Sequence, residues 1–298
     1  MMEKLRMSPF SIYHQCRDAF AFLQPPLIDC IIKAAKPEMI FLLGASLYSR
    51  RSESIFNISV PSSQHIADCF LLVLMRDLSD KEPYEWQDKI ENHCKKIVPV
   101  TVIVLQYTIF EEWLKAGHQF ACTVWQSAAL IYESGSVSCT VPTNTGVETT
   151  GKDRECFYGE GLAKAREFLA GSELFRVRKQ YSLAAFMLHQ SAEQALRTLL
   201  QTATGYHINT HSIDRLIRCA SLVAYRLPDI FPQKTEQDKR LLGLLQRAYT
   251  DTRYTTAYSI RREDLAALTE KVRHIHEILF DTGEAVFGTA ALSPEQLQ

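Results

Sequence analysis

The chain has 298 residues, of which 46% are hydrophobic and 22% are charged, as is typical of a globular protein with buried cores. Its 33 Lys and Arg residues nearly balance its 34 Asp and Glu residues, which argues against nucleic-acid binding driven by the net charge of the whole protein. The length favours two domains.

The cysteines and the apolar runs indicate the compartment. The eight cysteines are scattered without a C-x-x-C pair, a pattern typical of reduced thiols rather than of a disulfide framework. The N-terminal residues are not followed by the apolar core of a signal peptide, and no stretch approaches about 20 apolar residues. We therefore expect a soluble, cytoplasmic protein that makes no membrane contact.

The first half of the chain alternates helical and strand-like segments. Its predicted helices are 9–23, 26–35 (after Pro25 and Pro26), 83–96, 109–116 and 119–131. Its predicted strands are 38–44, 55–60, 66–75 and 98–105. The last of these strands is rich in β-branched residues, which favour strands. Together these segments predict a small α/β domain with a mixed sheet over residues 1–135.

The second half is predicted to be entirely helical. A stretch rich in Ser, Thr and Gly predicts a linker at 136–156. Apolar residues at helical spacing then predict helices at 158–175, 178–203 and 210–225, a fourth through Leu241–Ala248 and a fifth through Leu265–Leu279. Five helices with short connections predict a bundle over 157–287, followed by a tail at 288–298.

Two predicted strands carry the candidate cofactor-binding residues of the first half. The apolar run from residue 38 is interpreted as a strand that ends in a turn at Gly44-Ala45-Ser46. The strand 66–75 carries Asp68, and Phe70 stands two residues later. Alternate residues of a strand point to the same face, but a phenyl ring cannot bind a cation that prefers oxygen ligands. The residues therefore predict no complete metal site.

The second half resembles HEPN domains, which are helical bundles found beside minimal nucleotidyltransferases and in many prokaryotic defence systems. The resemblance covers roughly 158–282 and depends on residues 168–174, 181–197, 210–216 and 248–254. It implies a homodimer formed through the bundle. The wide apolar arc of the second helix and the aromatic residues around it favour the same dimer.

The first half resembles polymerase-β-type nucleotidyltransferases. Residues 33–46 match the lead-in to the Gly-Ser motif of that family, and residues 113–120 with 130–133 are similar to its closing helix and final short strand. The resemblance implies that Gly44 and Ser46 contact nucleotide phosphates and that Asp68 binds Mg²⁺. Phe70 replaces the second acid, and the strand 98–105 offers no third. The alternative is a strand-ending turn at Gly44 and a locally hydrogen-bonded Asp68.

The helical half lacks the motif of HEPN ribonucleases, in which an Arg is followed by a His after four to six residues. The corresponding positions after Arg253 hold Tyr258, Ser259 and Ile260. Arg253, Tyr254 and Tyr258 are instead predicted to line a polar groove together with Glu193. The alternative is an internal ion pair between Glu193 and an arginine such as Arg253.

One further pair in the helical half has metal-ligand spacing. His189 and Glu193 stand four residues apart, and His211 follows at the start of the next predicted helix. Zinc catalysis needs three protein ligands, and no third ligand is apparent. The sequence therefore predicts no confident metal site here.

These patterns predict an α+β protein with a small mixed-sheet nucleotidyltransferase-like α/β domain followed by an all-α HEPN bundle. We expect a non-catalytic nucleotide-binding or regulatory protein of the defence or toxin–antitoxin type, with nucleotide and Mg²⁺ as the implied cofactors. Two alternatives remain open. One is an active nucleotidyltransferase that transfers NMP to a protein or small molecule. The other is a module that binds RNA without cleaving it, for which a contiguous basic face is required.

Overall fold

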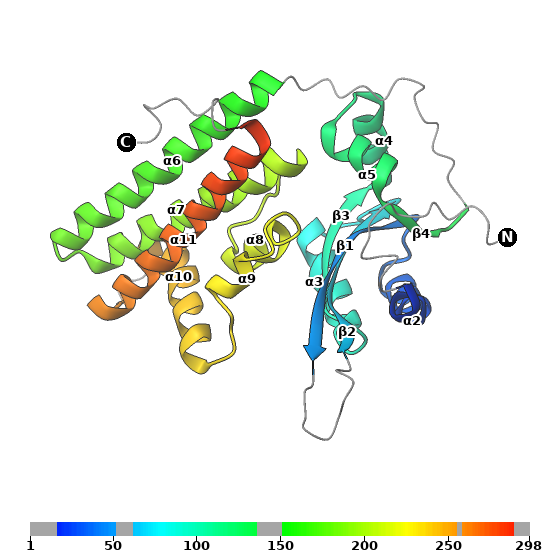
Figure 1. Cartoon of the computed structure of the whole chain (residues 1–298), viewed down its shortest axis with the longest axis horizontal. Helices are drawn as coiled ribbons and strands as arrows, with labels where there is room; N and C mark the ends of the chain where they lie inside the picture. The colour runs from blue at the N-terminus through cyan, green and yellow to red at the C-terminus, as the bar shows by residue number, and fades with distance from the viewer. Residues whose placement is uncertain (1–16, 52–61, 136–150, 255–257, 289–298) are drawn as a thin grey trace. The chain divides into compact units, whose positions relative to one another are not determined.

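The computed structural model describes residues 17–51, 62–135, 151–254 and 258–288 (Figure 1). The chain divides into two compact units, Met1–Glu148 and Thr149–Gln298. The first unit is a sheet with helices and the second is helical, so the fold class is α+β, as predicted. None of the helices in the described residues combines the length and hydropathy needed to cross a bilayer.

The N-terminal unit is built on a four-stranded sheet in the order β3-β2-β1-β4. In chain order its described elements are α2 (Arg17–Ala35), β1 (Met39–Arg51), β2 (Ser62–Met75), α3 (Pro83–Cys94), β3 (Val100–Gln106), α4 (Tyr107–Lys115), α5 (Gln119–Ser127) and β4 (Ala129–Glu133). β1 is antiparallel to β2 and β4, and β2 is parallel to β3. Because parallel neighbours need a crossover, α3 connects β2 to β3. The predicted mixed sheet is confirmed.

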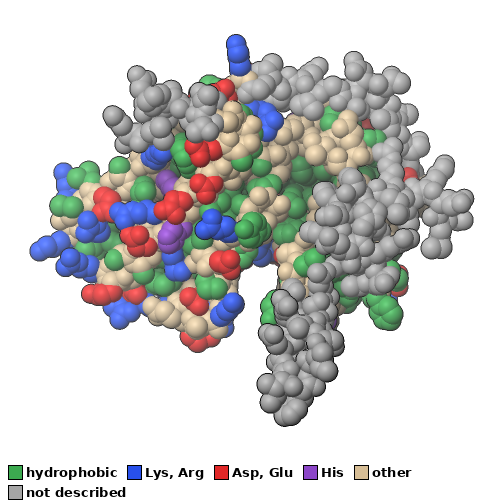
Figure 2. Space-filling model, viewed as in Figure 1, with side chains coloured by type: hydrophobic (Ala, Val, Ile, Leu, Met, Phe, Trp, Pro, Cys, Tyr) green, Lys and Arg blue, Asp and Glu red, His purple; other side chains and the backbone are tan. Residues whose placement is uncertain are grey.

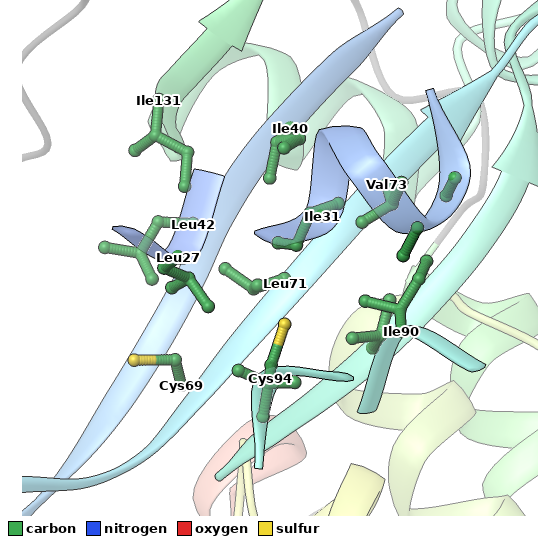
Figure 3. Packing of buried hydrophobic residues seen from close by; sticks show 14 of the residues in the cluster. Leu27, Ile31, Ile40, Leu42, Cys69, Leu71, Val73, Ile90, Cys94 and Ile131 are labelled. Carbon is green, nitrogen blue, oxygen red and sulfur yellow. The ribbon is translucent and has the colours of Figure 1, made fainter. Parts of the chain in front are cut away.

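Both faces of this sheet are covered, because side chains alternate along each strand. On one face, Leu71 of β2 packs in a buried cluster with Ile31 of α2 and Ile90 of α3 (Figure 3). On the other face, the ring of Phe41 lies 5.9 Å from Phe110 of α4 and 6.2 Å from Trp125 of α5. β2 is therefore buried on both sides, which explains its nearly continuous apolar sequence.

Two helix boundaries of the N-terminal unit were predicted wrongly. Pro25 and Pro26 lie inside α2 instead of separating two helices. Both prolines are exposed, so water can solvate the carbonyl groups that they leave without donors, and the buried Leu27 and Ile31 hold the helix on the sheet. The helix predicted at 119–131 ends at Ser127, because the next residues pair with β1 as β4. Residues 9–16 and 52–61, which include the strand predicted at 55–60, lie outside the described residues.

The C-terminal unit is a helical bundle arranged around one central helix. Its elements are α6 (Gly151–Val177), α7 (Tyr181–Thr204), α8 (Ile213–Ala220), α9 (Leu227–Ile230), α10 (Glu236–Tyr254) and α11 (Arg262–Phe287). α7 packs against α6, α8, α10 and α11, which accounts for its wide apolar arc. A Cβ atom at Gly161 of α6 would collide with Thr198 of α7, so this glycine permits the close approach of the two helices.

The bundle differs from its sequence prediction at three boundaries. α6 begins at Gly151, inside the segment predicted as a linker, of which residues 136–150 lie outside the described part of the chain. α7 begins only at Tyr181, because Lys179 adopts a positive φ of 61° and closes the turn after α6. α8 ends at Ala220, and the short helix α9, which contains Pro228, was not predicted.

Candidate functional site

The Gly44-Ala45-Ser46 segment is a bulged strand and not a turn. β1 continues to Arg51, with register shifts between Leu42 and Gly44 and between Ser46 and Leu47. The prediction of a turn was wrong because β2, which starts at Ser62, supplies partners along the whole length of β1. Such bulges re-aim side chains and often lie beside functional sites.

The register of β1 and β2 brings the predicted phosphate and metal residues together. Ser46 pairs with Asp68, and Gly44 pairs with Phe70. β4 pairs only with the residues from Met39 to Leu42. Among the described strands, β1 therefore has a single neighbour at Gly44 and Ser46, and one edge of its backbone has no strand partner there.

Asp68 is held by a hydroxyl group from the next strand. The Oγ1 atom of Thr101, on β3, donates to Oδ2 of Asp68 over 3.1 Å. The neighbouring Cys69 is buried, and this burial, reinforced by the charge of Asp68, raises the pKa of its thiol to about 12. Cys69 is therefore a packing residue and not a nucleophile.

Phe70 belongs to the core. Only 6% of its surface is exposed, and it lies on the same sheet face as Leu72, whose cross-strand partner Phe41 packs on α4 and α5. A carboxylate at this position would be buried among apolar groups, which is costly without a cation. Within the described part of the chain, no group of three or more His, Cys, Asp or Glu side chains could hold a metal ion.

A second polar cluster lies in the helical unit and is centred on Glu193 of α7. Glu193 is only 5% exposed. Its Oε1 atom lies 3.0 Å from Nη2 of Arg197, one turn later on α7, and 3.0 Å from Nδ1 of His211. The same Nη2 of Arg197 donates to the carbonyl of Thr210 over 2.6 Å. One guanidinium and one imidazole N–H thus satisfy a buried carboxylate, which would be costly to bury without such partners.

His189, the second metal-like residue of the sequence pattern, is a structural histidine. It is fully buried, and its Nε2 atom lies 3.2 Å from the carbonyl oxygen of His211. A carbonyl only accepts, so Nε2 carries the proton, and Nδ1 accepts from the amide of Gln190 over 3.4 Å. Nδ1 of His189 also lies 3.6 Å from Oε2 of Glu193, so both ring nitrogens have polar neighbours inside the bundle.

Tyr249 of α10 completes the cluster. Its ring stacks with two imidazole rings, with centroid distances of 5.0 Å to His189 and 4.4 Å to His211 and interplanar angles of 26° and 19°. Gln246, also on α10, donates to the carbonyl of His211 over 3.1 Å and accepts from the amide of Ile213 over 2.8 Å. The loop between α7 and α8 is thereby fixed to two helices.

The predicted HEPN groove includes Tyr258, which the structure places inside the bundle. Tyr258 is buried, its hydroxyl donates to the carbonyl of Leu244 over 3.0 Å, and burial raises its pKa. These contacts indicate a packing role for Tyr258, and the groove itself stays a prediction. Arg253 and Tyr254 end α10, but their side chains lie outside the described part of the structure.

In a serine–histidine pair elsewhere in the bundle, the hydrogen bond runs in the wrong direction for nucleophilic catalysis. The hydroxyl of Ser191 donates to the carbonyl of Ala165 over 2.9 Å and therefore accepts from Nε2 of His276 at 2.7 Å. A catalytic histidine would have to accept the serine proton instead. Burial, with a smaller contribution from Arg166, lowers the pKa of His276 to about 4.

Comparisons with known proteins bear chiefly on the helical unit. Residues 158–282 match the family model for the HEPN domain. No curated protein matches the chain. Among solved structures, the chain is similar to a nucleotidyltransferase-like protein from Exiguobacterium sibiricum 255-15, with 12% identity and a TM-score of 0.32, over 93% of this chain and 78% of that chain. The helical unit seen here and the family match together identify residues 158–282 as a HEPN domain.

Proposed function

We propose that this chain is a non-catalytic nucleotide-binding or regulatory protein. In this proposal the N-terminal unit keeps the phosphate-contacting strand of a nucleotidyltransferase-like domain and lacks its two-metal chemistry. The register of β1 and β2 carries the proposal, because Ser46 faces Asp68 while Gly44 faces the buried ring of Phe70. In-line nucleotidyl transfer needs ligands for two cations, and a phenyl ring supplies none.

The backbone of β1 supports nucleotide binding at the same place. Beyond Leu42, β1 has no partner on the β4 side among the described strands. Gly44 has no side chain to obstruct a ligand, and the bulges on either side of Gly44–Ser46 interrupt the regular ladder. Backbone N–H groups presented in this way can bind phosphate oxygens. Asp68 would then contact at most one cation.

The HEPN domain suggests the regulatory part of the proposal. We expect a homodimer formed through this domain and a role of the defence or toxin–antitoxin type. Leu174, Val177 and Leu183 support an interface, because all three flank the α6–α7 turn and are 52%, 71% and 38% exposed. Exposed aliphatic groups that cluster in this way commonly mark protein contacts.

Calorimetry and a transfer assay on the whole chain test the proposal. ATP should bind both with Mg²⁺ and with EDTA, and Gly44→Val should weaken binding at least about tenfold, because a branched side chain blocks the approach to the backbone. Tyr48→Ala is the matched control, since Tyr48 is an exposed residue later on the same strand. Transfer of α-labelled nucleotide to protein or a small acceptor that Asp68→Asn abolishes would contradict the proposal.

One observation favours RNA binding without cleavage as a second candidate. The hydroxyl of Ser182 donates to the carbonyl of Tyr258 over 3.1 Å, which places the α6–α7 turn beside the segment that precedes α11. Arg178, Lys179 and Arg262 are exposed at this end of the bundle, and Figure 2 shows Lys and Arg gathered toward the left end of the helical unit. Arg178→Glu should then abolish salt-dependent RNA binding, while unchanged binding would exclude this site.

A further inference from the structure

His211, in the loop between α7 and α8, has two ring nitrogens with different surroundings. Nδ1 donates to both oxygens of Glu193, at 3.0 Å and 3.2 Å. No described residue forms a hydrogen bond with Nε2, and 49% of the side chain is exposed. Nε2 therefore carries the lone pair of the neutral imidazole, and this lone pair is open to reagents in solution.

The carboxylate behind His211 is buried. Nη2 of Arg197 lies 3.0 Å from Oε1 of Glu193, so a guanidinium stands beside the carboxylate. A carboxylate that holds the Nδ1 proton fixes the tautomer of an imidazole and stabilises a positive charge that develops on the ring. The pair thus has the arrangement required of an activated histidine.

The ring of His211 is also held in one orientation. It stacks on Tyr249 at a centroid distance of 4.4 Å. The backbone carbonyl of His211 accepts from both His189 and Gln246. An exposed nucleophile that its surroundings hold in place is pre-organised for reaction.

We propose that Nε2 of His211 is a nucleophile that accepts a phosphoryl group from a phosphoanhydride, acyl phosphate or phosphoramidate donor. The lone pair of Nε2 forms the N–P bond, and the bond between phosphorus and the donor's leaving group breaks with its electrons on that group. The proton on Nδ1 stays in the hydrogen bond to Glu193, which balances the positive charge of the phosphorylated ring. This site does not depend on the nucleotide site proposed for the N-terminal unit.

The neighbouring helix explains why a phosphoryl group is favoured over a neutral acyl group. Ser212, the next residue, is the N-cap of α8, and its side chain accepts from the amide of Arg215. The positive end of this helix therefore lies directly after His211 in the chain. An added dianionic group is stabilised near such a helix end.

Chemical phosphorylation of the intact chain tests the proposal. The protein is treated in parallel with phosphoramidate, acetyl phosphate and Mg²⁺–ATP, and modified histidines are located by mass spectrometry under alkaline conditions. We expect one phosphoryl group on His211 from at least one donor and none in His211→Gln. Glu193→Gln should slow the reaction by about tenfold or more. His207→Gln is the control, because His207 is exposed on the same loop and its Nδ1 lies 3.1 Å from an amide oxygen of Gln201 instead of a carboxylate.

The proposal is overturned if no donor labels His211, if His207 is labelled equally fast, or if a folded Glu193→Gln protein reacts at the unchanged rate. Because Glu193 is buried, its substitution also strains the fold, so a second measurement uses the unmodified protein. Imidazole NMR of the neutral form should show the proton of His211 on Nδ1. A proton on Nε2 would remove the lone pair from the exposed nitrogen and exclude the mechanism.

Discussion

The β1–β2 pair of the N-terminal unit and the Glu193 cluster of the HEPN domain differ in what their buried positions hold. On β2, the residue two positions after Asp68 is an aromatic side chain that fills the core. In the HEPN domain, a buried carboxylate has two basic partners and a loop fixed around it. The strand position therefore depends on packing alone, whereas a buried polar network depends on every member.

The sharpest test of this comparison is to place an acid at Phe70 of β2. Phe70→Asp should destabilise the N-terminal unit by more than about 4 kcal/mol, because it removes a buried ring and places a charge among apolar groups. Phe70→Leu is the control and should cost about 1 kcal/mol. Chemical denaturation followed by tryptophan fluorescence measures the change, since all three tryptophans, at 86, 113 and 125, lie in this unit. A stable Phe70→Asp protein that binds two Mg²⁺ ions would contradict the assignment of this position to the apolar core.

Removal of the acid from the second region should cost somewhat less. Glu193→Ala leaves Arg197 and His211 without their common partner and should lower the free energy of unfolding by about 3 kcal/mol. Glu160→Ala, at an exposed position of α6, should change it by less than about 0.5 kcal/mol. Far-UV circular dichroism during urea unfolding measures both. Equal stability of the two variants would mean that the cluster is not a cooperative unit.

Acid should weaken the HEPN domain through His276. Its pKa is lowered from 6.5 to about 4 in the folded protein, so the unfolded chain binds the proton first as the pH falls. This contribution to stability is complete above about pH 6.5 and declines toward pH 4, by up to about 3 kcal/mol. His276→Gln should flatten this part of the pH profile, and His274→Gln, at an exposed neighbouring position, should leave it unchanged. A flat wild-type profile would contradict the buried neutral state of His276.

The smallest effect is expected at Thr101. Thr101→Val removes the hydroxyl that donates to Asp68 and should cost about 1 kcal/mol. Thr101→Ser keeps the hydroxyl and serves as the control. Denaturation of both variants under the same conditions measures the difference. If Thr101→Val is as stable as Thr101→Ser, the hydrogen bond does not hold Asp68 in place.

The sequence predicted the parts of the structure that depend on local periodicity. The strands β2 and β3 and the long helices α7 and α11 follow from apolar runs and from residues spaced three and four apart. The turn at Gly44 was predicted wrongly, because its conformation depends on pairing with a strand that begins at Ser62. The residues around Gly44 contain no local pattern from which this pairing could be predicted.

The candidate sites show the same limit. The absence of an acid two residues after Asp68, where Phe70 stands, was evident from the sequence, and Glu193 was identified within its helix. The partnership of Glu193 with Arg197 could have been found from their spacing of four residues. The contacts of Tyr249 and Gln246 with His211 could not have been predicted from the sequence, because both residues belong to α10 and meet His211 only in the assembled bundle.

An NMR titration of the isotope-labelled chain with ATP tests the central claim most directly. Nucleotide binding without two-metal chemistry predicts that the amide signals of Gly44, Ala45 and Ser46 shift with or without Mg²⁺, and that ATP stays intact during the titration. If these signals do not move, or if they move only when two metal ions bind and ATP is consumed with release of pyrophosphate, the account of the N-terminal unit is wrong.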